Sequence, residues 1–151
     1  MHISSLPSPH GIGTMGKAAR DFVDFLQESG QSYWQILPIC PTSYGDSPYQ
    51  SYSAFAGNPY FIDLDELKNM GLLEAKDYED VDWESTDEKV NYGVLYEKRY
   101  PILQKAAIKF LDKPSEEFEK FCKENEEWLP EFALFMALKD VHEGMQWSEW
   151  T

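Results

Sequence analysis

A long loop of turn-forming and aromatic residues at positions 40–60 is the feature that most restricts how this chain folds. The loop follows a short apolar run at residues 33–39, which is rich in aromatic and β-branched side chains. Such a run is typical of a buried strand. Structureless loops of this length are uncommon in compact domains and are often functional. Because α/β barrels build their sites in loops after strand ends, the sequence predicts an α/β fold with its site in this loop.

A helix is expected directly before that run, at residues 17–29. Its apolar residues recur at spacings of three and four, and Gly30 is placed to end it. A helix, a short link and a strand form the second half of a βαβ unit. The strand that should precede the helix lies before Met1 or survives only at residues 1–3. We therefore expect the first strand of the sheet to be incomplete.

Beyond residue 62 the pattern becomes mostly helical. A short helix is expected first, capped by Asp63 or Asp65 and ended by Gly71, and an acidic surface loop should follow at 74–88. The next helix, at 91–111, should be kinked or split at Pro101. Two further helices are expected, one capped by Ser115 and one at 129–142 with Pro130 in its first turn. We expect two parts. Residues 1–62 hold the first βα units with the loop 40–60, and residues 63–151 form a mostly helical insertion.

The charge balance excludes several kinds of partner. A formal net charge of −14 disfavours nucleic acids and anionic membranes, which both require clustered basic residues. The two cysteines, Cys40 and Cys122, lie far apart without a CxxC motif, so neither a disulfide nor a metal site is expected. We expect no cofactor, a cytoplasmic location by default, and a neutral ligand. No oligomeric state follows from the sequence.

The loop carries side chains suited to sugars, while nucleophile motifs such as GxSxG are absent from the sequence. Tyrosine offers an apolar face for a pyranose ring and a hydroxyl for its polar edge. Asp46 lies among these tyrosines and either binds a sugar hydroxyl or fixes the loop through an Asx turn. The alternative is a loop whose aromatics only cover the end of a barrel. His2 and His10 either line a cleft or are structural.

Three segments resemble the amylomaltases, the 4-α-glucanotransferases of glycoside hydrolase family 77. They are Ile3-Ser4-Ser5-Leu6-Pro7, Tyr33-Trp34-Gln35-Ile36-Leu37-Pro38, and the long segment from Gly45-Asp46-Ser47-Pro48-Tyr49 to Gly57-Asn58-Pro59-Tyr60. Weaker similarity continues through residues 91–96 and 133–139, so the resemblance covers the whole chain.

The resemblance implies the N-terminal part of a (β/α)₈ TIM barrel with a helical subdomain, and retaining transfer of α-1,4-glucan segments between maltooligosaccharides. The family's three catalytic acids come from later barrel strands, so no acid of this chain is assigned as catalytic, and we expect an inactive fragment. Ser47 and Tyr49 match positions that line the glucan cleft, beside Asp46. Tyr44 and Tyr96 match a secondary glucan site. The rival interpretations are a non-catalytic glucan-binding or interaction module and an α-amylase-type hydrolase.

Overall fold

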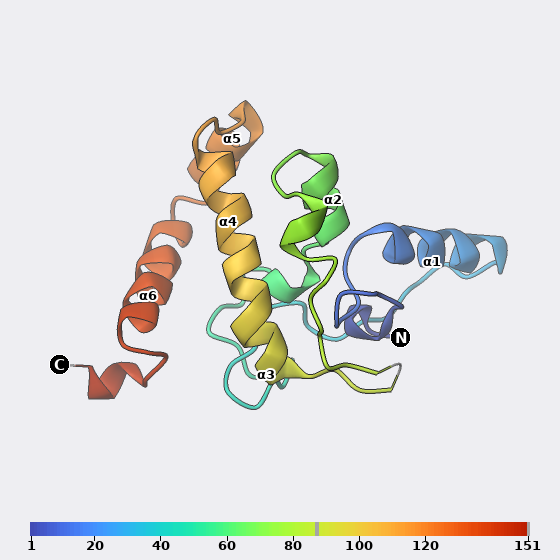
Figure 1. Cartoon of the computed structure of the whole chain (residues 1–151), viewed down its shortest axis with the longest axis horizontal. Coiled ribbons are helices and arrows are strands. Elements are labelled where there is room, and N and C mark those ends of the chain that lie inside the picture. Colours follow the sequence, from blue (N-terminus) through green and yellow to red (C-terminus); the bar gives the residue numbers. More distant parts are fainter. Residues whose placement is uncertain (87, 151) are drawn as a thin grey trace. The chain divides into compact units, whose positions relative to one another are not determined.

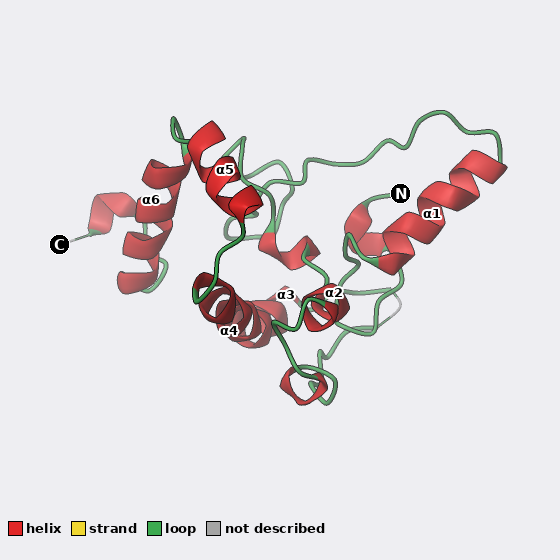
Figure 2. Ribbon diagram, turned by 90° about the horizontal axis from the view of Figure 1, so that it is seen from above, coloured by secondary structure: helices red, strands yellow, loops and turns green. Residues whose placement is uncertain are grey.

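The computed structural model describes residues 1–86 and 88–150. These residues form two compact units, one comprising Met1–Lys113 and the other beginning at Pro114. The first unit contains the predicted binding loop and consists of helices joined by long loops (Figures 1 and 2). Its elements are the 3₁₀ turn Ile3–Ser5, α1 at Lys17–Glu28, the 3₁₀ turn Pro59–Phe61, α2 at Leu64–Asn69, the 3₁₀ turn Ala75–Asp77, α3 at Tyr92–Val94, a π-helical turn at Leu95–Arg99, and α4 at Tyr100–Leu111.

The helix boundaries follow from local chemistry and confirm the sequence prediction. The Asp63 carboxylate caps α2 by accepting a hydrogen bond from the Glu66 amide at 3.0 Å. Gly30 and Gly71 end α1 and α2 with positive φ angles of 71° and 75°. Pro101 lies in the first turn of α4, and because the residues before it are already helical, its missing N–H removes one helical hydrogen bond. The helix is not split at Pro101: helical backbone continues from Tyr92 to Leu111, and the irregularity is the π-helical turn Leu95–Arg99 immediately before α4.

The prediction of a buried strand at residues 33–39 is wrong. This segment is extended but forms no strand, and among the described residues the backbone makes only one isolated β-bridge, elsewhere in the chain. The Tyr33 side chain is 92% exposed. A strand requires a row of hydrogen bonds along a neighbouring extended segment. This segment makes only separate contacts instead, such as the Leu37 amide donating to His2 Nδ1 at 3.2 Å and the Ile39 carbonyl accepting from the Asn58 amide at 2.8 Å. The expected α/β class is therefore corrected to a mostly helical fold for the described residues.

The hydrophobic core of the first unit joins the N-terminal loop to the helical segments. Its members are Ile3, Leu6, Ile12, Ala19, Tyr60, Phe61, Leu64, Leu73, Tyr78, Trp83, Leu95, Ile102 and Ala106. The acidic stretch 74–88 was expected to lie on the surface, but within its described part Tyr78 and Trp83 are buried. The surface prediction was based on the acidic residues of this stretch. Its two aromatic side chains pack into the core instead, because burying each one removes a large apolar area from water.

The second unit contains α5 at Glu116–Glu124, α6 at Leu129–Val141 and the 3₁₀ turn Trp147–Glu149. Ser115 caps α5 through a 3.2 Å hydrogen bond from the Phe118 amide, as predicted. His142 is the C-cap of α6, and its ring stacks on Trp150 with a centroid distance of 5.1 Å. Of the helices in the described part of the chain, none combines the length and the apolar character needed to span a membrane.

Candidate substrate-binding site

The loop at residues 40–58 is held in shape by its own hydrogen bonds. The Asn58 amide donates to the Ile39 carbonyl at 2.8 Å and closes the loop at its base. At the tip, the Ser43 amide donates to the Gln50 carbonyl at 3.0 Å. The turn between them has positive φ angles of 95° at Gly45 and 57° at Asp46. Glycine adopts this left-handed conformation freely and aspartate is among the few other residues that tolerate it, so both residues suit the turn.

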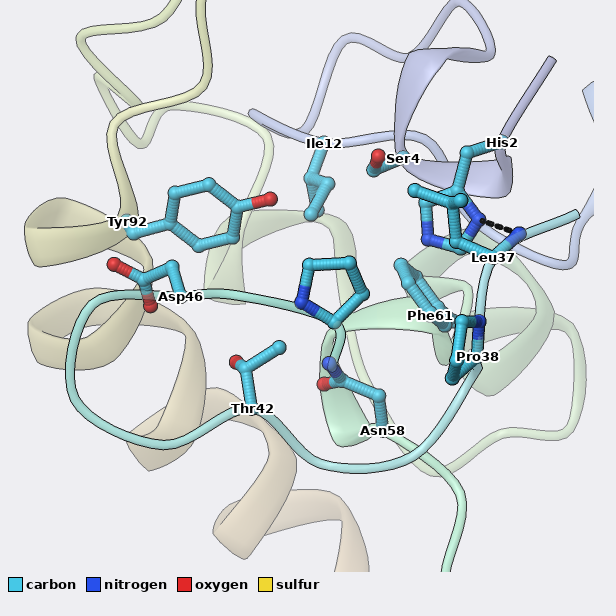
Figure 3. A pocket seen from close by; sticks show the side chains of 11 residues that line it. His2, Ser4, Ile12, Leu37, Pro38, Thr42, Asp46, Asn58, Phe61 and Tyr92 are labelled. Atoms are coloured by element: carbon cyan, nitrogen blue, oxygen red, sulfur yellow. Dashed lines mark hydrogen bonds between the residues drawn. The ribbon is translucent and has the colours of Figure 1, made fainter. Parts of the chain in front are cut away.

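A cavity of about 130 Å³ lies between this loop and the N-terminal turn (Figure 3). One set of lining residues carries polar groups, and the other is apolar. The polar set is His2, Ser4, Thr42, Asp46, Asn58 and Tyr92, and the apolar set is Ile12, Leu37, Pro38, Pro48 and Phe61. An amphipathic lining of this kind suits a ligand with both an apolar face and a hydroxyl-bearing edge.

The N-terminal part of the cavity depends on a tight fold of residues 2–14. The Gly13 amide donates to the Ser4 carbonyl at 3.1 Å. A side chain at Gly13 would collide with the backbone of Ile3 and Leu6, so glycine is required for this close approach. The closure brings Ser4 and Ile12 to the same side of the cavity, where Figure 3 shows both near the Tyr92 hydroxyl.

Asp46 lines the cavity, and its carboxylate lies beside the Tyr92 ring in Figure 3. Partial burial raises the pKa of this carboxyl group above its usual value. Of the two roles left open by the sequence, the Asx turn is not formed, because the residue two positions on is Pro48, which has no amide hydrogen. The carboxylate is therefore a candidate acceptor for a ligand hydroxyl.

Tyr92 is the first residue of α3 and was not predicted as a site residue. Burial, and then the nearby charge of Asp46, raise the pKa of its phenol, while a hydrogen bond with Ser4 opposes that rise. Its hydroxyl therefore remains protonated at neutral pH and is able to donate. The signal that pointed to Tyr92 was weak, since only the motif at residues 91–96 contained it.

Ser47 and Tyr49 lie on the same loop but outside the cavity lining. The half-buried Ser47 hydroxyl accepts a 3.4 Å hydrogen bond from the Tyr49 amide and so shapes the turn. The Tyr49 ring is 75% exposed. Asp46 and Pro48 thus line the cavity, while the Tyr49 side chain is exposed outside it.

Tyr44 and Tyr96 come together through Tyr52. The side chain of Tyr44 is 98% exposed and that of Tyr96 is 59% exposed. Burial raises the pKa of the Tyr52 phenol, and a hydrogen bond with the Tyr44 backbone opposes that rise. Tyr96 is close enough to raise the pKa of Tyr52 further. The two residues predicted to form a secondary site therefore border one tyrosine.

The two N-terminal histidines have different roles. His2 lines the cavity, and burial, followed by the terminal ammonium, lowers the pKa of its imidazole. His10 is buried, and its Nε2 lies 3.2 Å from Asp65 Oδ2, outside the cavity lining. Among the described residues, no group of three or more His, Cys, Asp or Glu side chains is placed to bind a metal ion.

Comparison with known proteins gives one consistent family. The sequence profile of glycoside hydrolase family 77, described as 4-alpha-glucanotransferase, matches residues 1–151. A 4-alpha-glucanotransferase of Clostridium butyricum is 51% identical over 150 residues, covering 99% of this chain and 31% of that protein. One from Streptococcus pneumoniae is 54% identical over 151 residues, covering 99% of this chain and 30% of its own length.

A solved structure shows the same backbone arrangement. The amylomaltase from Streptococcus agalactiae, in complex with acarbose, superposes with a TM-score of 0.93 and 46% sequence identity, over 99% of this chain and 30% of that one. The chain thus spans about 30% of the length of the relatives that it matches.

Proposed function

The chain belongs to the 4-alpha-glucanotransferase family, glycoside hydrolase family 77, and on this premise we propose that it forms the N-terminal part of an enzyme that transfers α-1,4-glucan segments between maltooligosaccharides. The proposed reaction is a retaining double displacement, with a glycosyl-enzyme intermediate formed on a carboxylate. The catalytic acids are proposed to lie outside these 151 residues.

The amphipathic cavity under the loop is the observation that carries this proposal. Asp46, Ser4 and Tyr92 supply an acceptor and hydroxyl groups, while Ile12, Pro48 and Phe61 supply apolar contact. We propose that this cavity receives one edge of a glucose unit. The exposed Tyr49 and its neighbour Ser47 are proposed to contact the same glucan from the mouth of the cavity.

Tyr44 and Tyr96 are proposed to form a secondary glucan site. Their exposed rings border Tyr52, and neighbouring exposed tyrosines provide flat apolar surfaces on which sugar rings stack. This site is distinct from the cavity because neither tyrosine belongs to its lining.

The architecture of the complete enzyme is also part of the proposal. We propose that residues 1–62 begin a (β/α)₈ barrel and that residues 63–151 belong to a helical subdomain. The support is the exposed apolar side chains of the extended segment 33–39, including Ile36 and Leu37, together with the likeness to an amylomaltase. A cytoplasmic location is proposed because both cysteines are free thiols.

The test is a disproportionation assay on the complete enzyme that contains this segment. Incubation with maltotriose should yield glucose and longer maltodextrins, whereas release of shorter sugars alone would indicate a hydrolase. Tyr92→Phe and Asp46→Asn each remove one polar group from the cavity and should lower kcat/KM about 3- to 10-fold.

Asp24→Asn is the matched control for this assay. It makes the same charge change at an exposed position on α1 and should leave kcat/KM unchanged. Glucan binding by the complete protein without any transfer would favour the non-catalytic binding module instead.

A further inference from the structure

Arg99 is completely buried at the end of the π-helical turn. Its Nη1 donates to the His10 carbonyl at 3.0 Å, and its Nη2 donates to the Ile62 carbonyl at 2.6 Å. The guanidinium carbon lies 5.7 Å from the centroid of the Trp83 ring. Burial lowers the pKa of Arg99 to about 10, so the group still carries its charge at neutral pH.

The two carbonyls that Arg99 binds belong to residues close in sequence to two different walls of the cavity, although neither His10 nor Ile62 lines it. His10 is two residues from Ile12, which lines the cavity on the N-terminal side. Ile62 follows Phe61, which lines it on the side of the 3₁₀ turn. The guanidinium therefore links two walls whose chain positions are about fifty residues apart.

The same helical segment supplies a third wall. Tyr92 begins this segment and Arg99 lies seven residues further along it. Arg99 is bonded to the segments beside both of the other walls, so it connects the helix that carries Tyr92 to the segments that carry Ile12 and Phe61.

Burial of a cation is costly, and a well-packed apolar side chain would often be at least as stable. Arg99 has no carboxylate within ion-pair distance among the described residues, and it bonds to two main-chain oxygens instead. The planar guanidinium donates in two fixed directions at once, which the single ammonium of lysine does not reproduce. Such a contact specifies geometry between the segments that it joins.

We propose that Arg99 is a positioning residue for the substrate cavity, holding the Ile12 wall and the Phe61 wall at the separation that a glucose unit requires. This inference rests on the proposed function of the cavity. It adds a residue that touches no substrate and acts through the two main-chain segments that it joins.

The test compares Arg99→Lys and Arg99→Met with Leu73→Ala in the complete enzyme. Leu73 is buried in the same core but neither lines the cavity nor bonds to its walls, so its truncation controls for lost stability. At a temperature where all variants are folded by circular dichroism, both Arg99 variants should raise the KM for maltotriose at least about 10-fold, since small misplacements of binding groups have large effects. Leu73→Ala should retain the wild-type KM.

A second measurement uses wild-type protein and does not depend on the variants folding. If Arg99 holds the walls together, the amides of Gly13 and Asn58, one near each wall, should open with the same free energy in hydrogen exchange. Independent opening of the two amides would overturn the proposal. Wild-type KM in the Arg99 variants, or an equal rise in Leu73→Ala, would do so as well. A wild-type enzyme without transfer activity would refute the proposed function, and the exchange result would still decide the role of Arg99.

Discussion

Tyr96 and Arg99 are three residues apart in one helical segment, yet the Tyr96 side chain is exposed and Arg99 is completely buried. In a regular α-helix, residues three apart share a face. The π-helical turn Leu95–Arg99 adds a residue to the hydrogen-bonded ring and so separates the two side chains around the axis. One turn thereby presents Tyr96 to the surface beside Tyr52 and directs Arg99 toward the walls of the cavity.

Substitution of Tyr49 and of Tyr44 should separate the cleft from the secondary site. In the complete enzyme, Tyr49→Ala removes an exposed apolar face and a hydroxyl from the loop and should lower kcat/KM for maltotriose about 10- to 100-fold. Tyr44→Ala should leave maltotriose turnover near the wild-type value and change the sizes of products formed from amylose. Both variants should be compared at equal melting temperature. Equal effects of the two variants on both substrates would contradict the division into two sites.

The 151-residue chain by itself should have no transferase activity. Retaining transfer requires two carboxyl groups about 5–5.5 Å apart at the bond that breaks, and among the described residues that line the cavity Asp46 is the single carboxylic acid. Incubation of the purified chain with maltotriose should leave the sugar unchanged on chromatography. Disproportionation that persists in protein purified by two independent routes would show that the site is complete.

The isolated chain should also be loosely packed or prone to aggregation. Large apolar side chains on α1 and in the extended segment, among them Phe25 and Tyr33, are exposed, and the extended backbone has unpaired groups available to other chains. We expect binding of a hydrophobic dye and a broad thermal transition. A sharp cooperative melt with well-dispersed amide resonances would contradict this expectation.

Acid should weaken a contact between α2 and the buried part of the acidic loop. The Tyr78 hydroxyl donates to Asp65 Oδ1 at 2.6 Å, and this hydrogen bond is the main reason that the pKa of Asp65 lies below its usual value. Because the folded-state pKa is the lower one, the stabilisation is complete above the unfolded-state value of about 3.9 and is lost as the pH falls toward the folded-state value.

Tyr78→Phe tests this pH dependence in the complete enzyme. The variant should be about 1 kcal/mol less stable at neutral pH, a modest figure because the Asp65 side chain is 56% exposed. The difference in melting temperature from wild type should shrink at about pH 3. Tyr96→Phe removes an exposed hydroxyl and should show no such trend. A difference for Tyr78→Phe that stays constant between the two pH values would show that the hydrogen bond does not titrate with Asp65.

Local signals in the sequence determined the helices of this protein. The caps at Asp63 and Ser115 and the stop at Gly30 each depend on neighbouring atoms, so they could be predicted without tertiary structure. The loop at residues 40–60 was predictable for the same reason, since its turn formers and tyrosines are contiguous. Asp46 was therefore proposed as a site residue, and the structure places it in the cavity lining.

The tertiary structure decided everything that depends on pairing between distant segments. The run at 33–39 has the composition of a strand, but a strand exists only where a partner lies alongside, and the described residues provide none. Tyr92 and Ser4 line the cavity, and Tyr78 and Trp83 lie in the core. The spacing of apolar residues along the sequence does not indicate these contacts, because they form between distant segments. The clearest case is Arg99, an ordinary charged residue in the sequence, whose importance arises because folding places two carbonyl oxygens from separate loops within reach of one guanidinium.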